Sequence, residues 1–256
     1  MNRIFANMPP VTKNLLIINV LIWGAMALIP ALDVKLTKWC ALHFFTSPGF
    51  NAAQLVTYMF LHAGMAHLFF NMFALVMFGG VIERTMGPKR FLTYYLSCGI
   101  FAALVQMAVY AIVLTKYTHM FPADQLHEAI VAMWDYMNGK ADRVSYSVLQ
   151  IINSPEFLTI NSLVNGPMVG ASGAIYGIIL AFGMLYPNQP LYLFFIPVPI
   201  KAKYLVIGYG VLELCLGLGS MSDNIAHFAH LGGMIAGIIL IIYWKKKGVF
   251  NNHWFF

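Results

Sequence analysis

The chain alternates between long apolar runs and short polar connections. A membrane-spanning helix needs about 20 mostly apolar residues, and the pattern predicts six spans. They cover residues 14–32, 65–81, 90–114, 168–186, 204–221 and 225–244. None shows the two-residue alternation that is typical of a barrel strand. Ala25-Met26-Ala27 resembles a signal-peptide cleavage site, but the apolar run continues to Leu32, which favours a retained helix.

Composition agrees with a membrane protein. The chain is 60% hydrophobic and 9% charged, whereas soluble domains carry roughly 25% charged residues. Only lipid can cover so much apolar surface, so the formal charge of +6 does not indicate a nucleic-acid partner. The three cysteines have no metal-like spacing, and inert packing is expected for them. They are Cys40, Cys98 and Cys215.

The placement of the cations predicts the orientation. Lys and Arg mark the cytoplasmic side of membrane proteins, and here they flank alternate connections. They are Arg3, Lys13, Arg84, Lys89, Arg90, Lys201, Lys203 and Lys245 to Lys247. With six spans, both termini are expected in the cytoplasm, and a bacterial inner or plasma membrane is the expected location. The expected fold is all-α: one membrane domain, residues 1–256, with a six-helix bundle.

The connection after the third span is a long external insert, residues 116–167. It carries five acids and three bases, as an external loop allows. Residues 124–134 predict an amphipathic helix with an acidic first turn, ended by Asn138-Gly139. This helix either lies on the bilayer surface or caps the bundle, and the sequence leaves both open.

Ser172 is a candidate nucleophile. It lies in Gly170-Ala171-Ser172-Gly173, at the start of an apolar helix. Gly170 and Gly173 leave room for a substrate to approach the backbone. The helix N-terminus favours a developing oxyanion. The alternative is a capping serine or a small residue in a tight helix contact.

His230 is the candidate base, because a neutral imidazole can accept a serine proton near neutral pH. It lies in Ala229-His230-Leu231-Gly232-Gly233, at the start of the last span, and His227 is its local competitor. The alternative is a structural histidine. Since no aspartate lies near Ser172 or His230 in sequence, we expect a dyad, with something other than a carboxylate orienting the imidazole.

Glycine patterns predict how these two residues meet. Gly173 and Gly177 lie four residues apart on the fourth span, and Gly233 and Gly237 do so on the sixth. Such small-residue patterns let membrane helices pack closely. Span four is therefore expected to contact span six.

His67 and Asn71 are candidate oxyanion donors. They lie at i and i+4, hence on one helix face, and both can donate hydrogen bonds. An interhelical polar bond is the alternative. A metal site, or a transporter built on His62, His67, His227 and His230, is disfavoured because there is no H-E-x-x-H pattern and few carboxylates lie in the spans. No metal or cofactor is expected.

These motifs together, in this order, resemble the rhomboid intramembrane serine proteases. The resemblance covers spans two to six. It implies that Ser172 is the nucleophile, that His230 is the general base, and that His67 and Asn71 line the oxyanion hole with the Ser172 N–H. It also implies a cavity open to the extracytoplasmic side and single-pass membrane proteins as substrates. An inactive rhomboid-like protein that binds membrane clients is the alternative.

The resemblance also assigns supporting residues. His62 corresponds to a buried histidine, and Tyr176 to an aromatic that stacks beneath the catalytic histidine. Glu83 with Gly87 resembles a structural motif that ends the second span.

Three features depart from the family pattern. Trp39 is followed by Cys40 rather than by arginine, so the packing of the first external loop is open. The insert is long, and its role is open. Glu213 lies within span five, which is a proposed lateral gate in the family. We expect Glu213 to be buried and hydrogen-bonded or protonated, with gating as an alternative.

Overall fold

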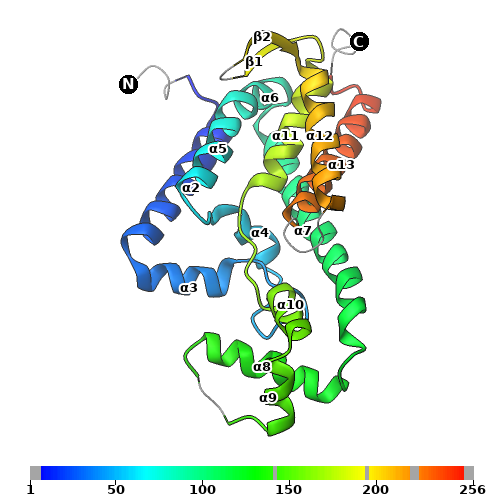
Figure 1. Ribbon diagram of the computed structural model, residues 1–256. Coiled ribbons are helices and arrows are strands. Elements are labelled where there is room, and N and C mark those ends of the chain that lie inside the picture. Colours follow the sequence, from blue (N-terminus) through cyan, green and yellow to red (C-terminus); the bar gives the residue numbers. More distant parts are fainter. Residues whose placement is uncertain (1–6, 141–142, 194–195, 220–224, 251–256) are drawn as a thin grey trace.

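The computed structural model describes residues 7–140, 143–193, 196–219 and 225–250, and it is mostly helical (Figure 1). Within these ranges, five helical segments are long and apolar enough to cross a membrane, so the chain is a multi-pass membrane protein. They are α2 (Pro10–Leu28), the continuous segment of α5 (Met65–Ala74), η2 (Leu75–Gly79) and α6 (Gly80–Met86), then α7 (Pro88–Thr118), α12 (Ala202–Gly219) and α13 (Ile225–Lys246).

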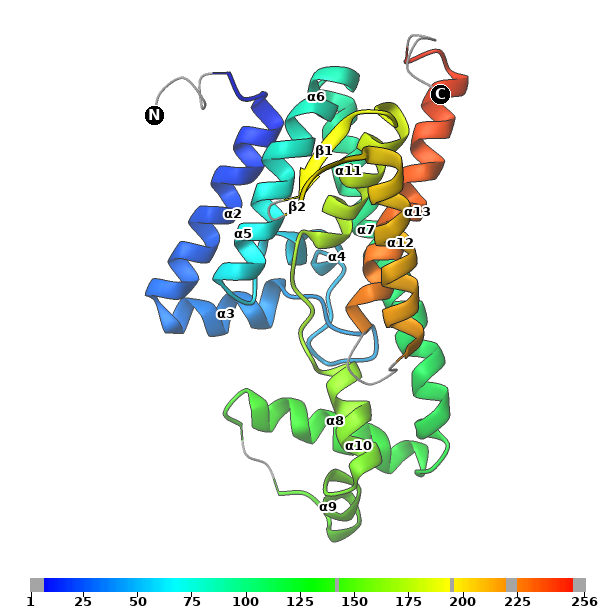
Figure 2. The same cartoon turned by 45° about the horizontal axis from the view of Figure 1, so that its top comes forward.

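The fourth predicted span is shorter than expected. Helix α11 (Ser172–Leu185) has 14 residues, which is about 21 Å, whereas the hydrocarbon core is about 30 Å thick. The residues just before it are not helical: Met168 pairs with Leu42 in an isolated bridge, and the Gly170 N–H donates to the Tyr58 carbonyl at 3.0 Å. The chain thus enters the bundle extended, and α11 begins inside it (Figures 1 and 2).

The first span also ends earlier than predicted. Helix α2 stops at Leu28, and Ile29 is extended because Pro30 follows it and disfavours helical geometry in the preceding residue. Pro30 then starts α3 (Pro30–Cys40), which lies across the end of the bundle nearest the insert (Figure 1).

The predicted contact between the fourth and sixth spans is confirmed. A side-chain carbon added to Gly233 of α13 would lie 1.8 Å from the carbonyl oxygen of Gly173 in α11. One added to Gly177 would lie 2.6 Å from the sulfur of Cys98 in α7. Helices α7, α11 and α13 therefore pack very closely, because the glycines leave no side chain between them.

The insert forms a helical layer with its own apolar core. It comprises the end of α7, then α8 (Ala123–Met137), α9 (Tyr146–Ile152) and α10 (Pro155–Val164). Phe157 and Ile160 are fully buried in this core, together with Leu114 of α7. Helix α8 coincides with the predicted amphipathic helix; it ends at Met137 and is followed by Asn138 and by Gly139 with φ +73°. Helices α9 and α10 were not predicted.

The loop between α3 and α4 (Gln54–Thr57) packs against this insert. The short helix η1 (Tyr58–Phe60) follows α4. The Ser47 hydroxyl donates to the Asn165 side chain at 2.8 Å, and the His43 ring meets the Trp134 ring edge-on at 5.1 Å. The Trp39 side chain remains exposed. The loop thus acquires its packing from the insert.

The opposite end of the bundle holds the start of α2 and the end of α13, and we call it the termini end (Figure 1). A hairpin of β1 (Pro190–Leu193) and β2 (Ile196–Lys201) also lies there; its prolines concealed it in the sequence. Glu83 of α6 is buried and accepts hydrogen bonds from the N–H groups of Val11 and Thr12 at 2.9 and 2.7 Å. It thereby caps the N-terminus of α2.

Candidate active site

Ser172 and His230 come together where α11 meets α13. Ser172 is the first residue of α11, and the Nε2 atom of His230 lies 2.9 Å from its hydroxyl oxygen. Both side chains are partly buried. Because 57 residues separate them in the chain, only the close glycine contact between the two helices brings them within hydrogen-bonding distance.

His67 faces the same small space as Ser172. Gly170 has φ +131°, and a side-chain carbon there would lie 2.8 Å from the His67 Nε2 atom and 3.7 Å from the Ser172 hydroxyl oxygen. Only glycine fits both this backbone conformation and this space. Gly170 therefore leaves open the position at which His67 and Ser172 converge.

Asn71 lies one turn beyond His67 on α5. Its side chain is buried, and its Nδ2 donates to the His67 carbonyl oxygen at 3.0 Å. It also lines a cavity beside the site. The Asn71 amide carries two hydrogens, so one can remain on this carbonyl while the other donates to an oxyanion.

His62, just before α5, is buried against His67, with ring centroids 5.1 Å apart. Among the described residues, neither of its ring nitrogens has a hydrogen-bond partner. Burial, and to a lesser extent the neighbouring His67, lowers the pKa of His62 to about 4. The ring is therefore neutral at pH 7.

Tyr176 and Glu213 surround the His230 ring. The Tyr176 ring stacks on it at 4.2 Å with an interplanar angle of 7°, and the Tyr176 hydroxyl donates to the Glu213 carboxylate. The Nδ1 atom of His230 lies 3.1 Å from Glu213 Oε2, and His227 Nδ1 contacts the same oxygen. Something other than a carboxylate was expected to orient the imidazole, but α12 packs on α13 and brings Glu213, an acid distant in sequence, beside the ring.

The four histidines considered for a metal site form two separate pairs. His62 lies against His67, while His227 and His230 lie against Glu213. Glu213, His227 and His230 each offer a ligand atom, and these atoms lie within 4.8 Å of one another. Two imidazoles and a carboxylate are a donor set that zinc accepts.

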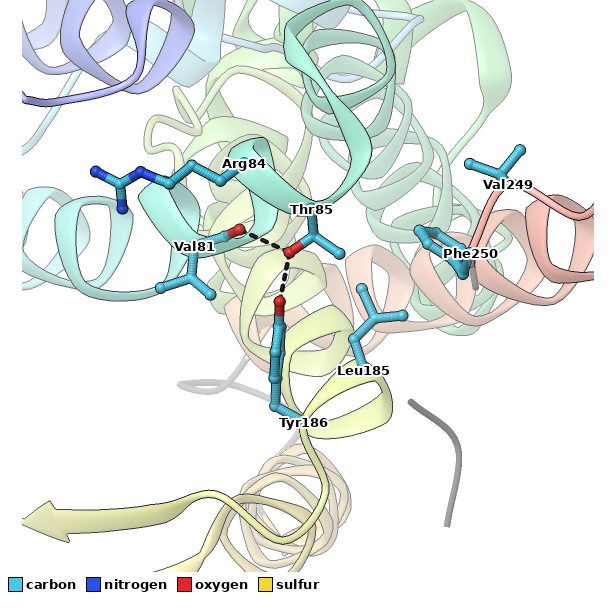
Figure 3. A pocket seen from close by; sticks show the side chains of 7 residues that line it. All are labelled: Val81, Arg84, Thr85, Leu185, Tyr186, Val249 and Phe250. Carbon is cyan, nitrogen blue, oxygen red and sulfur yellow. Dashed lines mark hydrogen bonds between the residues drawn. The ribbon is translucent and has the colours of Figure 1, made fainter. Parts of the chain in front are cut away.

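Two cavities adjoin α11, one beside its first turns and one at its C-terminal end. One, of about 730 Å³, is bordered by α5, α11, α12 and β1, and Asn71 and Tyr176 are among its mostly apolar lining residues. The other, of about 380 Å³, lies at the termini end (Figure 3). There, Thr85 donates to the Val81 carbonyl and contacts the Tyr186 hydroxyl. Only the first cavity adjoins residues of the candidate site.

The rhomboid domain matches residues 50–115 and 143–247, which is more than half of the chain. YdcA of Bacillus subtilis is 29% identical over 245 residues, covering 92% of this chain and 89% of that protein.

Two further relatives are longer. Rhomboid protease AarA of Providencia stuartii is 31% identical over 195 residues, covering 72% of this chain and 53% of AarA. RHOMBOID-like protein 12, mitochondrial, of Arabidopsis thaliana is 30% identical over 201 residues, covering 77% of this chain and 47% of that protein. The chain thus spans about half the length of these two relatives. From the match of the domain, together with the helical membrane fold, we conclude that this chain belongs to the rhomboid family.

Proposed function

We propose that this chain is an intramembrane serine endopeptidase that cleaves single-pass membrane proteins in or near their transmembrane segments. The observation that carries the proposal is the 2.9 Å contact between His230 Nε2 and the Ser172 hydroxyl. The names of relatives such as AarA, a rhomboid protease, support it. Residues 1–256 would act as one domain.

The proposed mechanism begins with His230 taking the Ser172 proton as the hydroxyl oxygen attacks the scissile carbonyl. The Ser172 N–H at the start of α11, with His67 and Asn71, would donate to the oxyanion. His230 then gives the proton to the leaving amine, which leaves an acyl-enzyme. Water, deprotonated by His230, attacks the acyl-enzyme, and His230 returns this proton to the Ser172 oxygen as the second product leaves.

The apolar cavity of about 730 Å³ supports a membrane segment as substrate. It adjoins Tyr176 of the site and reaches Leu205 and Tyr209 of α12. An unwound part of a substrate helix could reach Ser172 from this side, while its apolar remainder stays in lipid.

The positive charges support both termini in the cytoplasm and the insert outside. Arg84, Lys89 and Lys245 lie at the ends of helices that meet at the termini end. The site then opens to the extracytoplasmic side of a bacterial inner or plasma membrane.

The test is cleavage of a type I membrane substrate in proteoliposomes by wild type and by Ser172→Ala. We expect wild type to cut and Ser172→Ala to lose at least about 10,000-fold in kcat, with an unchanged Tm. Labelling of wild type by a fluorophosphonate probe, absent in Ser172→Ala, separates a protease from a client-binding protein. Cleavage by Ser172→Ala at the wild-type rate would refute the proposal.

A further inference from the structure

We infer that Glu213 is a positioning residue that extends the Ser172–His230 pair to a serine–histidine–glutamate triad. The inference rests on the proposed protease function. Its core observation is the 3.1 Å distance between the Nδ1 atom of His230 and the Oε2 atom of Glu213. On the other side of the same ring, Nε2 contacts the Ser172 hydroxyl at 2.9 Å.

The orientation of α12 places Glu213 toward the site. Its neighbours Leu212 and Leu214 are 50% and 46% exposed, whereas Glu213 is 4% exposed. An acid buried in a membrane helix is costly unless it is paired. Its partners are the Tyr176 hydroxyl and the two imidazoles of α13. These contacts hold the carboxylate beside His230.

The carboxylate determines which ring nitrogen of His230 carries the proton. In the neutral ring, one nitrogen carries hydrogen and the other accepts. Nδ1 is buried and, within the described residues, has no hydrogen-bond partner of good geometry, while the Glu213 oxygen is the acceptor beside it. The negative charge of this oxygen, 3.1 Å away, favours the form of the ring with its hydrogen on Nδ1, so Nε2 is left to accept from Ser172.

The Glu213 carboxylate also stabilises the protonated form of the His230 ring. When Ser172 attacks, its proton moves to Nε2, and His230 becomes a cation with a hydrogen on each nitrogen. The Glu213 carboxylate then stabilises this cation and remains ionised, and the proton later leaves with the amine product. Tyr176 adds a second constraint, because its ring stacks on His230 while its hydroxyl holds the other Glu213 oxygen.

His227 shares the oxygen that faces His230, and this fits an orienting partner. A carboxylate oxygen has two lone pairs, so Oε2 can accept from both rings. His227 and Tyr176 together keep the carboxylate from turning away. Glu213 thus acts through His230 and needs no contact with substrate.

The test compares Glu213→Gln with wild type in proteoliposomes. Glutamine keeps the shape and can still accept from Tyr176, but it lacks the negative charge. We expect kcat to fall roughly 100- to 10,000-fold, with KM within about twofold of wild type and with slower fluorophosphonate labelling of Ser172. Glu213→Asp, which retains the charge, should keep more activity than Glu213→Gln.

Glu83→Gln is the matched control, because Glu83 is also buried in a membrane helix but accepts its hydrogen bonds from Val11 and Thr12 of α2. It should retain the wild-type kcat per folded molecule. In a His230→Ala background, adding Glu213→Gln should change the labelling rate by less than about twofold, because Glu213 acts through the ring.

Three outcomes would overturn the inference: a Glu213→Gln kcat within threefold of wild type, an equal loss in Glu83→Gln, or inactivation by EDTA that zinc reverses. The last would make Glu213, His227 and His230 ligands of a cation. If Glu213→Gln does not fold, a Glu213→Asp variant that folds but has less than 1% activity would also refute the role of the charge. Wild type and Ser172→Ala run in parallel, so failure of the protease proposal is recognised separately.

Discussion

Glu83 and Glu213 are two buried glutamates at opposite ends of the bundle, 2% and 4% exposed. Glu83 accepts from backbone N–H groups and a threonine hydroxyl of α2, none of which changes its charge at physiological pH. Glu213 accepts from a tyrosine and faces two imidazoles, a side chain that can act as acid or base in catalysis. Burial alone therefore does not distinguish a structural glutamate from one that takes part in catalysis. The groups that contact the carboxylate make this distinction.

Among variants outside the Ser172–His230–Glu213 group, the largest effect is expected from separating the helices at the site end. In Gly233→Ala, the new methyl group would meet the Gly173 carbonyl oxygen, pushing α13 away from α11. A displacement of about 1 Å at the reacting atoms can cost about 100-fold in rate. We expect kcat to fall by at least this factor and Tm to fall, measured by cleavage assay and thermal denaturation in detergent. Gly208→Ala, with open space around it, is the control; an equal loss there would refute the packing argument.

A smaller effect is expected at the candidate oxyanion donors. His67→Ala or Asn71→Ala should each lower kcat by roughly 10- to 1,000-fold, because one oxyanion donor is worth a few kcal/mol. Measurement of kcat and KM separately, together with Tm, distinguishes lost transition-state stabilisation from lost folding. Unchanged rates in both variants would remove the oxyanion assignment and restrict that role to the Ser172 N–H.

The smallest effect on catalysis is expected at Glu83, where stability should change instead. Glu83→Gln places an NH₂ group opposite a backbone N–H of Val11 or Thr12. Leaving a buried donor unsatisfied costs about 1–3 kcal/mol, so Tm should fall while kcat per folded molecule stays within about twofold. A loss of kcat with unchanged Tm would contradict the structural role of Glu83 and with it the difference between the two glutamates.

Much of the fold could be predicted because lipid imposes a local rule: a spanning helix must be apolar along its length. The five long spans follow it. Helix α8 follows another local rule, the helical period of its apolar residues. The rule failed at α11, whose first predicted residues are extended because Met168 and Gly170 bond to neighbouring loops. It also missed β1 and β2, where prolines hide the strand pattern.

The sequence by itself determined that the chain is a membrane protein, that Ser172 and His230 begin apolar helices, and that glycines allow those helices to touch. These are local properties of residue type and spacing. Only the tertiary structure decided that Glu213 faces His230, because that contact depends on how α12 packs against α13. A carboxylate finds its partner through the distances between side chains in space, which its position in the chain does not specify.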